Sequence, residues 1–192
     1  PVTVWNVTRT CNLRCIHCYT DSEAKKYGGE LTTEEGKALI RDLAGFQIPA
    51  LLFSGGEPLA RPDLFDLVAC ARSLGVRPTL STNGTLITDE TARQIKNAGF
   101  TYVGISLDGI GEINDRFRGV GGAFERAVRG FKACVAVGQR VGLRLTLTRH
   151  NVANLHGIFD FIEREQIDRA CFYHLVYSGR GATCNKPVRI LP

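Results

Sequence analysis

Three cysteines lie within eight consecutive residues, in the segment Cys11-Asn-Leu-Arg-Cys15-Ile-His-Cys18. Thiolates grouped this closely bind a soft or borderline metal centre. Three cysteines so near one another are not typical of a disulfide framework. A structural zinc ion takes a fourth protein ligand, and His17, between two of the cysteines, is poorly placed to bind the same ion. The spacing therefore favours an iron–sulfur cluster over zinc, with three irons held by cysteine and one iron open to a ligand.

Polar and glycine residues also follow three strand-like segments, and the carboxyl ends of barrel strands are where active sites are built. The three motifs are Ser54-Gly55-Gly56-Glu57-Pro58, Ser81-Thr82-Asn83-Gly84 and Ser106-Leu107-Asp108-Gly109. Glycine lets the backbone approach a ligand closely, and Glu57 can accept a hydrogen bond from an ammonium group. Alternation along a strand places Ser81 with Asn83 on one face. It places Ser106 with Asp108 in the same way.

Strand-like and helix-like patterns alternate six times along the chain, and the cysteine segment follows the first strand. Strands are expected at 2–8, 50–54, 76–82, 101–107, 141–148 and 170–177. Helices are expected between them, from a capping box at 32–35, from Asp63, from Thr88 to near Gly99, over 124–137 and over 152–164. This alternation predicts parallel strands joined by right-handed crossovers.

The size and polarity of these units distinguish a barrel from a doubly wound open sheet. Six units in 192 residues correspond to about 32 residues each, close to the value of about 31 for an eight-unit barrel. Strand 141–148 alternates apolar residues with Gly142, Arg144 and Thr146, although a parallel strand buried on both faces is almost continuously apolar. We therefore predict an α/β fold, a partial TIM-type (β/α)6 barrel with a polar, ligand-lined interior. Exposure at a sheet edge is the alternative.

Composition and charge narrow the class of protein further. Hydrophobic residues make up 44% and charged residues 22% of the chain, as in an ordinary globular domain. The net charge of +5 is too mild to indicate a nucleic-acid partner. No segment is typical of a signal peptide or of a membrane span, so we expect a cytoplasmic protein without a membrane partner. Because the chain begins at Pro1 and contains no Met, we expect it to be part of a longer protein.

The cysteine spacing resembles the CxxxCxφC signature of the radical S-adenosylmethionine (SAM) superfamily, with His17 in the usually aromatic φ position. Gly55-Gly56-Glu57-Pro58 is similar to the family's GGEP motif, which holds the amino group of SAM. The motifs that follow the third and fourth strands resemble the family's ribose and carboxylate contacts. The resemblance extends from Val4 to Gly181 and implies the radical SAM core fold.

This resemblance implies a role for each candidate residue. Cys11, Cys15 and Cys18 would hold a [4Fe–4S] cluster, whose fourth iron binds the amino and carboxylate groups of SAM. The residues implied in binding SAM are His17, Gly55, Gly56, Glu57, Ser81, Asn83, Ser106 and Asp108. Arg144 is expected either to meet the SAM carboxylate or to form an internal ion pair with Asp108 or Glu57. With an electron from a donor protein, SAM would yield a 5′-deoxyadenosyl radical that takes a hydrogen atom from the substrate.

Two segments, 12–19 and 114–119, resemble the branch of the family that carries C-terminal SPASM or Twitch extensions. We therefore expect residues 1–181 to form the radical SAM domain and residues 182–192 to begin a linker to such an extension. An auxiliary cluster would belong to that extension, and Cys184 is either one of its ligands or a loop residue. Cys70, Cys134 and Cys171 are expected to be small buried apolar residues.

Two further segments, 5–11 and 172–181, resemble the tetrapyrrole-modifying members of this branch, which act in haem d1 biosynthesis and in the alternative, sirohaem-dependent haem pathway. The resemblance implies an oxidoreductase that removes propionate side chains from didecarboxysirohaem. Arg118 and Arg180 are candidates for binding the substrate carboxylates, and His174 either faces the macrocycle or is a hydrogen-bonded core residue. The alternatives are a SPASM-type maturase of peptides or proteins, and a non-catalytic iron–sulfur or zinc protein.

Overall fold

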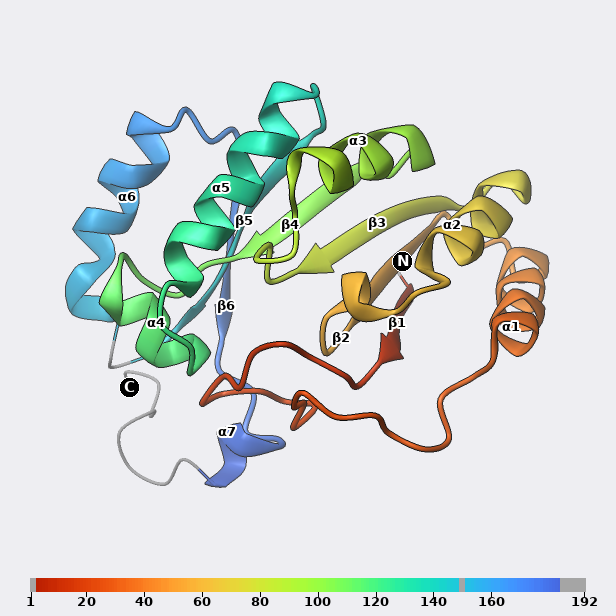
Figure 1. Ribbon diagram of the computed structural model, residues 1–192, viewed down its shortest axis with the longest axis horizontal. Helices are drawn as coiled ribbons and strands as arrows, with labels where there is room; N and C mark the ends of the chain where they lie inside the picture. The colour runs from red at the N-terminus through yellow and green to blue at the C-terminus, as the bar shows by residue number, and fades with distance from the viewer. Residues whose placement is uncertain (1–2, 149–150, 184–192) are drawn as a thin grey trace.

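A computed structural model describes residues 3–148 and 151–183, which form one sheet of six parallel strands (Figure 1). The strands are β1 (Thr3–Thr8), β2 (Ala50–Gly55), β3 (Arg77–Thr82), β4 (Tyr102–Ser106), β5 (Val141–Leu147) and β6 (Ala170–His174). Each strand pairs with its neighbour in sequence, in the order β1-β2-β3-β4-β5-β6. A doubly wound sheet reverses its strand order partway, so this order confirms the predicted partial barrel. Within the described residues β1 and β6 are not paired, and the barrel is open.

Helices lie along the outer side of the curved sheet (Figure 1). The longer helices are α1 (Thr33–Gly45), α2 (Leu64–Ser73), α3 (Asp89–Ala98), α5 (Ala123–Ala136) and α6 (Leu155–Arg164). The short ones are η1 (Pro58–Ala60), α4 (Glu112–Arg118), η2 (Val152–Asn154) and α7 (Arg180–Thr183). The long segment between β1 and α1, which carries the three cysteines, runs past the ends of the strands and reaches α7. In the described part of the chain, none of the helices is long and apolar enough to cross a bilayer.

The hydrophobic core lies between the sheet and these helices. Val103 and Ile105 of β4 are fully buried together with Leu67 and Val68 of α2. The alternate residue Ser106 of β4 faces the interior of the barrel instead. The predicted division of the strands into an apolar outer face and a polar inner face is therefore confirmed.

Local signals in the sequence set the helix ends. Thr32 caps α1, since its hydroxyl accepts a hydrogen bond from the Glu35 N–H while the Glu35 carboxylate accepts one from the Thr32 N–H at 2.8 Å. This is the predicted capping box. Helix α3 begins after Thr88 and ends at Gly99, whose φ of 78° lies in the left-handed region that favours glycine.

The structure differs from the sequence-based expectation in two elements. Strand β6 ends at His174 rather than near Tyr177, because the chain turns after Leu175 and closes a hydrogen bond from Ser178 N–H to Val176 O. Helix α4 was not predicted, since seven residues are too few to show a helical period. Of the expected linker, residues 182–183 belong to α7. Cys184 and the rest of the linker lie outside the described residues.

Candidate active site

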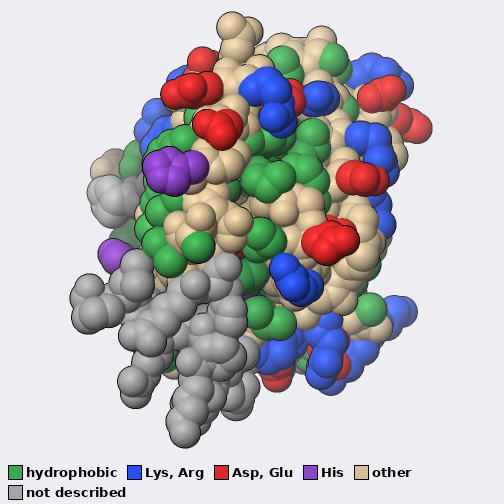
Figure 2. Space-filling model, turned by 90° about the vertical axis from the view of Figure 1, so that its left-hand side faces the viewer, with side chains coloured by type: hydrophobic (Ala, Val, Ile, Leu, Met, Phe, Trp, Pro, Cys, Tyr) green, Lys and Arg blue, Asp and Glu red, His purple; other side chains and the backbone are tan. Residues whose placement is uncertain are grey.

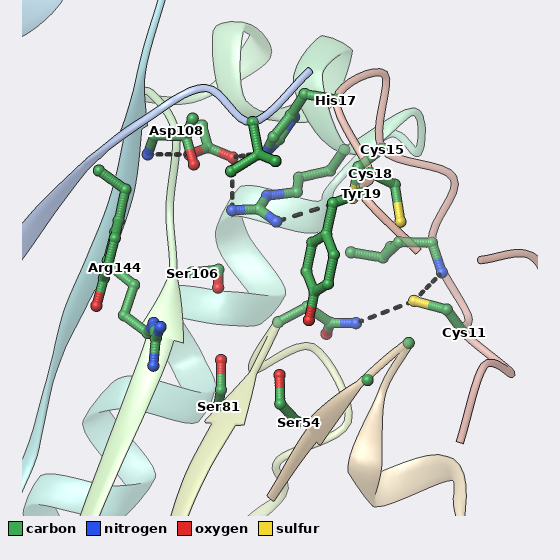
Figure 3. A pocket seen from close by; sticks show the side chains of 18 of the residues that line it. Cys11, Cys15, His17, Cys18, Tyr19, Ser54, Ser81, Ser106, Asp108 and Arg144 are labelled. Carbon is green, nitrogen blue, oxygen red and sulfur yellow. Dashed lines mark hydrogen bonds and ion pairs between the residues drawn. The ribbon is translucent and has the colours of Figure 1, made fainter. Parts of the chain in front are cut away.

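A pocket of about 340 Å³ opens at the carboxyl ends of the strands (Figure 3). It is lined by nearly all the residues that the sequence singled out. These are Cys11, Cys15, His17, Cys18, Gly55, Gly56, Ser81, Asn83, Ser106, Asp108 and Arg144. Of the residues expected to bind SAM, Glu57 is the one that does not line it. Strand alternation predicted this convergence correctly, because parallel strands end on the same side of the barrel.

The three cysteines occupy one wall of the pocket, on the loop after β1. Burial raises the pKa of the Cys11 thiol to about 12 and also raises the pKa of Cys15, which the Arg118 charge opposes. Burial acts in the same direction on Cys18, but hydrogen bonds from Thr20 and Ser22 outweigh it and lower the pKa. Burial therefore disfavours the ionised form of two of the three thiols, and a bound metal centre would supply the positive charge that stabilises thiolates.

This wall fits a cluster better than a single ion. Among the described residues, no three His, Cys, Asp or Glu side chains surround a point where one metal ion would sit. A [4Fe–4S] cluster spreads its cysteine ligands over separate irons, so its thiolates stand farther apart than the ligands of one zinc ion. Cys11, Cys15 and Cys18 line one pocket, where each thiol could bind a separate iron of such a cluster.

A buried charged group lies beside the cysteines. The Asp108 carboxylate is 2.6 Å from Arg118 Nη2 and 3.2 Å from His17 Nε2 through the same oxygen, Oδ2. Burial would raise the pKa of Asp108, but the Arg118 guanidinium and His17 hold it at about 2. Arg118 also approaches Cys15, with Nη1 3.8 Å from the sulfur. His17 is thus held by Asp108 and by the edge of the Phe117 ring, whose centroid is 5.4 Å away.

Two buried asparagines fix the loop that carries Asp108. Asn114 Oδ1 accepts a hydrogen bond from the Asp108 N–H at 3.0 Å, and Asn151 Nδ2 donates to the Asp108 carbonyl at 2.9 Å. The Thr146 N–H donates to Asp108 Oδ1 at 2.8 Å. The sequence reasoning missed both asparagines. Asn114 belongs to the motif 114–119, but its partner lies six positions away and no local pattern indicates the contact.

Glu57 connects the ends of two strands. Its fully buried carboxylate accepts hydrogen bonds from Leu59 N–H at 3.1 Å, from the Thr82 hydroxyl at 2.7 Å and from Asn83 N–H at 2.7 Å. Burial raises the pKa of this carboxyl, and the three donated hydrogen bonds oppose that rise. Because both oxygens are occupied behind the pocket wall, the structure does not bring Glu57 together with the other candidates. It instead orients Asn83, whose Nδ2 is 3.9 Å from Cys11 Sγ.

The two glycines before Glu57 pack against the cysteine loop. A Cβ on Gly55 would lie 2.2 Å from Thr8 O, and a Cβ on Gly56 would lie 2.4 Å from Thr10 O. The Gly56 N–H donates to Thr8 O at 2.7 Å. Glycine was expected here so that the backbone could approach a ligand. In the structure the close approach is to the β1 backbone, which fixes where the cysteine loop leaves the strand.

Arg180 fastens the segment after β6 to the same loop. Its guanidinium donates to Cys15 O at 2.8 Å, to Asp21 Oδ1 at 2.7 Å and to Ser22 O at 2.8 Å. The Arg180 N–H donates to Cys18 O at 3.0 Å. Arg180 also lines the pocket, but these donors face the cysteine loop, and its binding of a substrate carboxylate stays a prediction.

The far side of the pocket is formed by β5 and β6. Arg144 lies over the ring of Tyr173, with its guanidinium carbon 4.9 Å from the ring centroid. The expected ion pair of Arg144 with Asp108 or Glu57 is not formed, because Arg118 and His17 occupy Asp108. His174 is exposed and lines the pocket mouth, so its interpretation as a core residue was wrong. Tyr173 was not singled out from the sequence.

The other cysteines match their expectation only in part. Cys134 is fully buried in the core, and burial raises its pKa to about 11. Cys70 and Cys171 are only partly buried. Cys171 lies among polar groups, beside Arg169 and Tyr173.

Fold and site together define a class of protein, a partial parallel barrel that presents three cysteine thiols in a polar pocket at the ends of its strands. The model of the radical SAM superfamily matches residues 5–162, and the chain belongs to this family. Membership implies a [4Fe–4S] cluster and SAM as cofactors.

Two curated relatives and one solved structure illustrate the similarity. The chain is 56% identical over 182 residues to Fe-coproporphyrin III synthase of Methanosarcina barkeri, covering 95% of this chain and 46% of the relative. It is 48% identical over 181 residues to pre-heme d1 synthase of Dinoroseobacter shibae, covering 94% and 45%. The SAM-bound structure of Streptococcus suis SuiB has a TM-score of 0.81 at 18% identity, covering 100% of this chain and 43% of SuiB, and supports the fold alone. The chain thus spans about half the length of these relatives.

Proposed function

We propose that the chain is the SAM-cleaving core of a radical SAM enzyme that acts on a tetrapyrrole in haem or haem d1 biosynthesis. One observation carries the proposal: three cysteine thiols share a single pocket with the polar carboxyl ends of β3 and β4. An iron–sulfur electron carrier would need cysteine ligands for its cluster but no pocket beside them. A zinc-stabilised domain would need a fourth protein ligand. Neither explains a lined pocket beside the thiols.

The residues around the pocket divide into cluster ligands and SAM contacts in this proposal. Cys11, Cys15 and Cys18 hold the [4Fe–4S] cluster. The SAM contacts are His17, Gly55, Gly56, Ser81, Asn83, Ser106 and Asp108. Glu57 acts indirectly, since its carboxylate orients the Asn83 backbone from behind the wall. When bound, the cluster and SAM supply one electron and the carbon radical that takes a hydrogen atom from the substrate.

Fixed charges prepare the pocket for this chemistry. Asp108 holds His17 against Phe117 and holds Arg118 beside Cys15, so the ring and the guanidinium keep their positions. Asn114 and Asn151 fix the Asp108 loop in turn. A pre-positioned site needs no rearrangement at the moment of reaction.

The substrate class is supported by the two relatives, whose names place them in tetrapyrrole synthesis. We infer that the substrate is didecarboxysirohaem or a related iron tetrapyrrole, and that the 5′-deoxyadenosyl radical takes a hydrogen atom from the β-carbon of a propionate side chain and becomes 5′-deoxyadenosine. The whole protein would also need an electron donor protein. An extension beyond residue 181 would carry any auxiliary cluster, with Cys184 as one candidate ligand.

The test is anaerobic reconstitution of the cluster, reduction with dithionite in the presence of SAM, and detection of 5′-deoxyadenosine. We expect 5′-deoxyadenosine, and we expect its formation to rise when didecarboxysirohaem is added. Formation that responds to no tetrapyrrole would overturn the substrate and favour a peptide maturase. A cluster-loaded protein that makes none would overturn the radical SAM activity itself.

A further inference from the structure

Three arginines line the pocket, and two of them are already engaged. Arg118 is paired with Asp108 at 2.6 Å. Arg180 donates to Cys15 O, Asp21 and Ser22. Arg144 is different: within residues 3–148 and 151–183 it has no carboxylate partner, and its guanidinium lies over the ring of Tyr173. Its half-buried guanidinium therefore presents unused hydrogen-bond donors to the pocket.

The surrounding strands make room for this side chain. A Cβ on Gly104 of β4 would lie 2.6 Å from Arg144 Cδ, so glycine lets the Arg144 stem cross that strand without shifting. Tyr102, two residues earlier, extends over Gly142, where a Cβ would lie 2.4 Å from both the Tyr102 hydroxyl and Arg169 O. Two glycines on adjacent strands thus accommodate one arginine and one tyrosine in the barrel interior.

The same layer contains a second polar group without a partner. The Tyr102 hydroxyl oxygen is buried, and it has no hydrogen-bond partner in the described part of the chain. Buried polar atoms are usually hydrogen-bonded. An anionic group that entered beside Arg144 would approach an unpaired guanidinium in a region that also holds this hydroxyl.

Arg144 lies across the pocket from the cysteines (Figure 3). Ser54 and Ser81 lie between them in this view, on the ends of β2 and β3. The family resemblance implies that the carboxylate of SAM would bind the cluster iron, which the three cysteines would hold at the cysteine wall. The Arg144 guanidinium lies at the opposite wall, where it would meet a carboxylate other than that of SAM.

We propose that Arg144, whose guanidinium lies over the ring of Tyr173, is the binding site for a carboxylate side chain of the substrate. This inference rests on the proposed function and adds to it the residue that anchors the tetrapyrrole. The planar guanidinium of an arginine offers a paired set of donors that suits a propionate or acetate group. Because this guanidinium lies over Tyr173, a carboxylate bound to it would stay on the side of the pocket opposite the cysteines.

The experiment compares Arg144→Gln, Arg144→Lys and the control Arg169→Gln in the cluster-loaded enzyme. Arg169 also stacks on a tyrosine, with its guanidinium carbon 5.2 Å from the Tyr102 ring centroid, but it does not line the pocket. Binding of didecarboxysirohaem is followed by its visible absorption, and SAM binding by equilibrium dialysis. The methyl ester of the tetrapyrrole, which lacks free carboxylates, is the matched ligand.

For Arg144→Gln we expect tetrapyrrole affinity to fall by about tenfold to a hundredfold, the usual effect of a charged hydrogen bond. Affinity for SAM and for the methyl ester should stay within about threefold of the unmutated enzyme. The tetrapyrrole affinity of Arg144→Lys should lie between that of Arg144→Gln and that of the unmutated enzyme. Arg169→Gln should bind the tetrapyrrole like the unmutated enzyme.

Other outcomes would overturn specific parts of the inference. A loss of SAM affinity with unchanged tetrapyrrole affinity would assign Arg144 to the SAM carboxylate instead. Equal tetrapyrrole affinity in Arg144→Gln and the unmutated enzyme would show that Arg144 does not bind the substrate carboxylate. That result would leave the proposed function intact. Failure of the unmutated enzyme to bind any tetrapyrrole would overturn the proposed function itself.

Discussion

Arg180 Nε donates a hydrogen bond to the carbonyl oxygen of Cys15 at 2.8 Å, although the two residues are 165 positions apart in the chain. The barrel is open between β6 and β1 within the described residues. The bond therefore joins α7, which follows the last strand, to the loop after the first strand, although these two strands do not pair in the described part of the chain. Gly179 permits this contact, since a Cβ there would lie 2.4 Å from Cys18 O.

We predict that Arg180→Gln lowers the amount of iron bound after reconstitution by several-fold, because Cys15 and Cys18 lose the contacts that hold their backbone. Arg180→Lys should recover only part of it, since lysine cannot donate in three fixed directions. Iron content and the electron paramagnetic resonance spectrum of the reduced cluster measure the effect. Arg93→Gln, an exposed change on α3, is the control, and equal loading of all four proteins would contradict the prediction.

Cys15→Ala should abolish SAM cleavage while the fold is retained. Cys15 packs against a small group of Cys11, Leu13 and Ala123, separate from the main core. Its removal should therefore cost only about 1 kcal/mol of unfolding free energy. The checks are 5′-deoxyadenosine formation and circular dichroism, with Cys70→Ala as a control outside the pocket. Global unfolding of Cys15→Ala would show that the metal site is structural.

How much the sequence predicted depends on the range of the contacts. Alternation along β4 and the spacing of Cys11, Cys15 and Cys18 are local patterns. Both indicated residues that line the same pocket in the structure. The contacts of Arg180 and Asn151 link segments far apart in the chain. No local pattern carries such contacts, so they could not be predicted from the residues on either side of them.

Glu57 shows a different reason for an incomplete prediction. Its motif indicated the correct place, but the direction of a side chain depends on which donors surround it. Thr82 and Asn83 on the neighbouring strand end attract the carboxylate away from the pocket. The register of the neighbouring strands determines which donors face the Glu57 carboxylate, and that register is set when the strands pair.

Glu57→Gln should lower the unfolding free energy by about 1–3 kcal/mol, because three N–H or O–H donors face the carboxylate and an amide nitrogen cannot accept from any of them. Urea unfolding measures this change. Glu163→Gln, an exposed change on α6, should have little effect. If Glu57→Gln kept full stability and lost SAM affinity alone, the carboxylate would contact SAM directly, as the sequence motif first indicated.

The Arg61–Asp63 pair should make stability depend on acid pH. Hydrogen bonds from Arg61 and Thr33 hold the pKa of Asp63 at about 2, below its usual value of about 3.9. A lowered carboxyl pKa stabilises the fold above the unfolded-state value, and that contribution is lost as pH falls from about 4 to about 2. At pH 7, Asp63→Asn should cost on the order of 2 kcal/mol. In cluster-free protein the difference from the unmutated chain should shrink toward pH 2, and a constant difference would contradict the assignment.

Arg118 should raise the reduction potential of the cluster. Its guanidinium is buried, lies 3.8 Å from Cys15 Sγ and is held by Asp108. Reduction adds negative charge to the cluster, so a nearby cation and an N–H donor to sulfur favour the reduced state. Removal of this donor should shift the midpoint potential to more negative values, by about 60 mV for each 1.4 kcal/mol lost in a one-electron couple.

The variant must avoid leaving Asp108 as an unpaired buried charge, which would itself cost several kcal/mol of stability. Arg118→Gln combined with Asp108→Asn removes both charges of the pair, and Arg118→Lys retains the cation without its fork of donors. A redox titration followed by electron paramagnetic resonance should give the most negative potential for the double variant and an intermediate value for lysine. An unchanged potential in the double variant would mean that the field of Arg118 at the cluster is balanced by that of Asp108, so that the pair serves only to position His17.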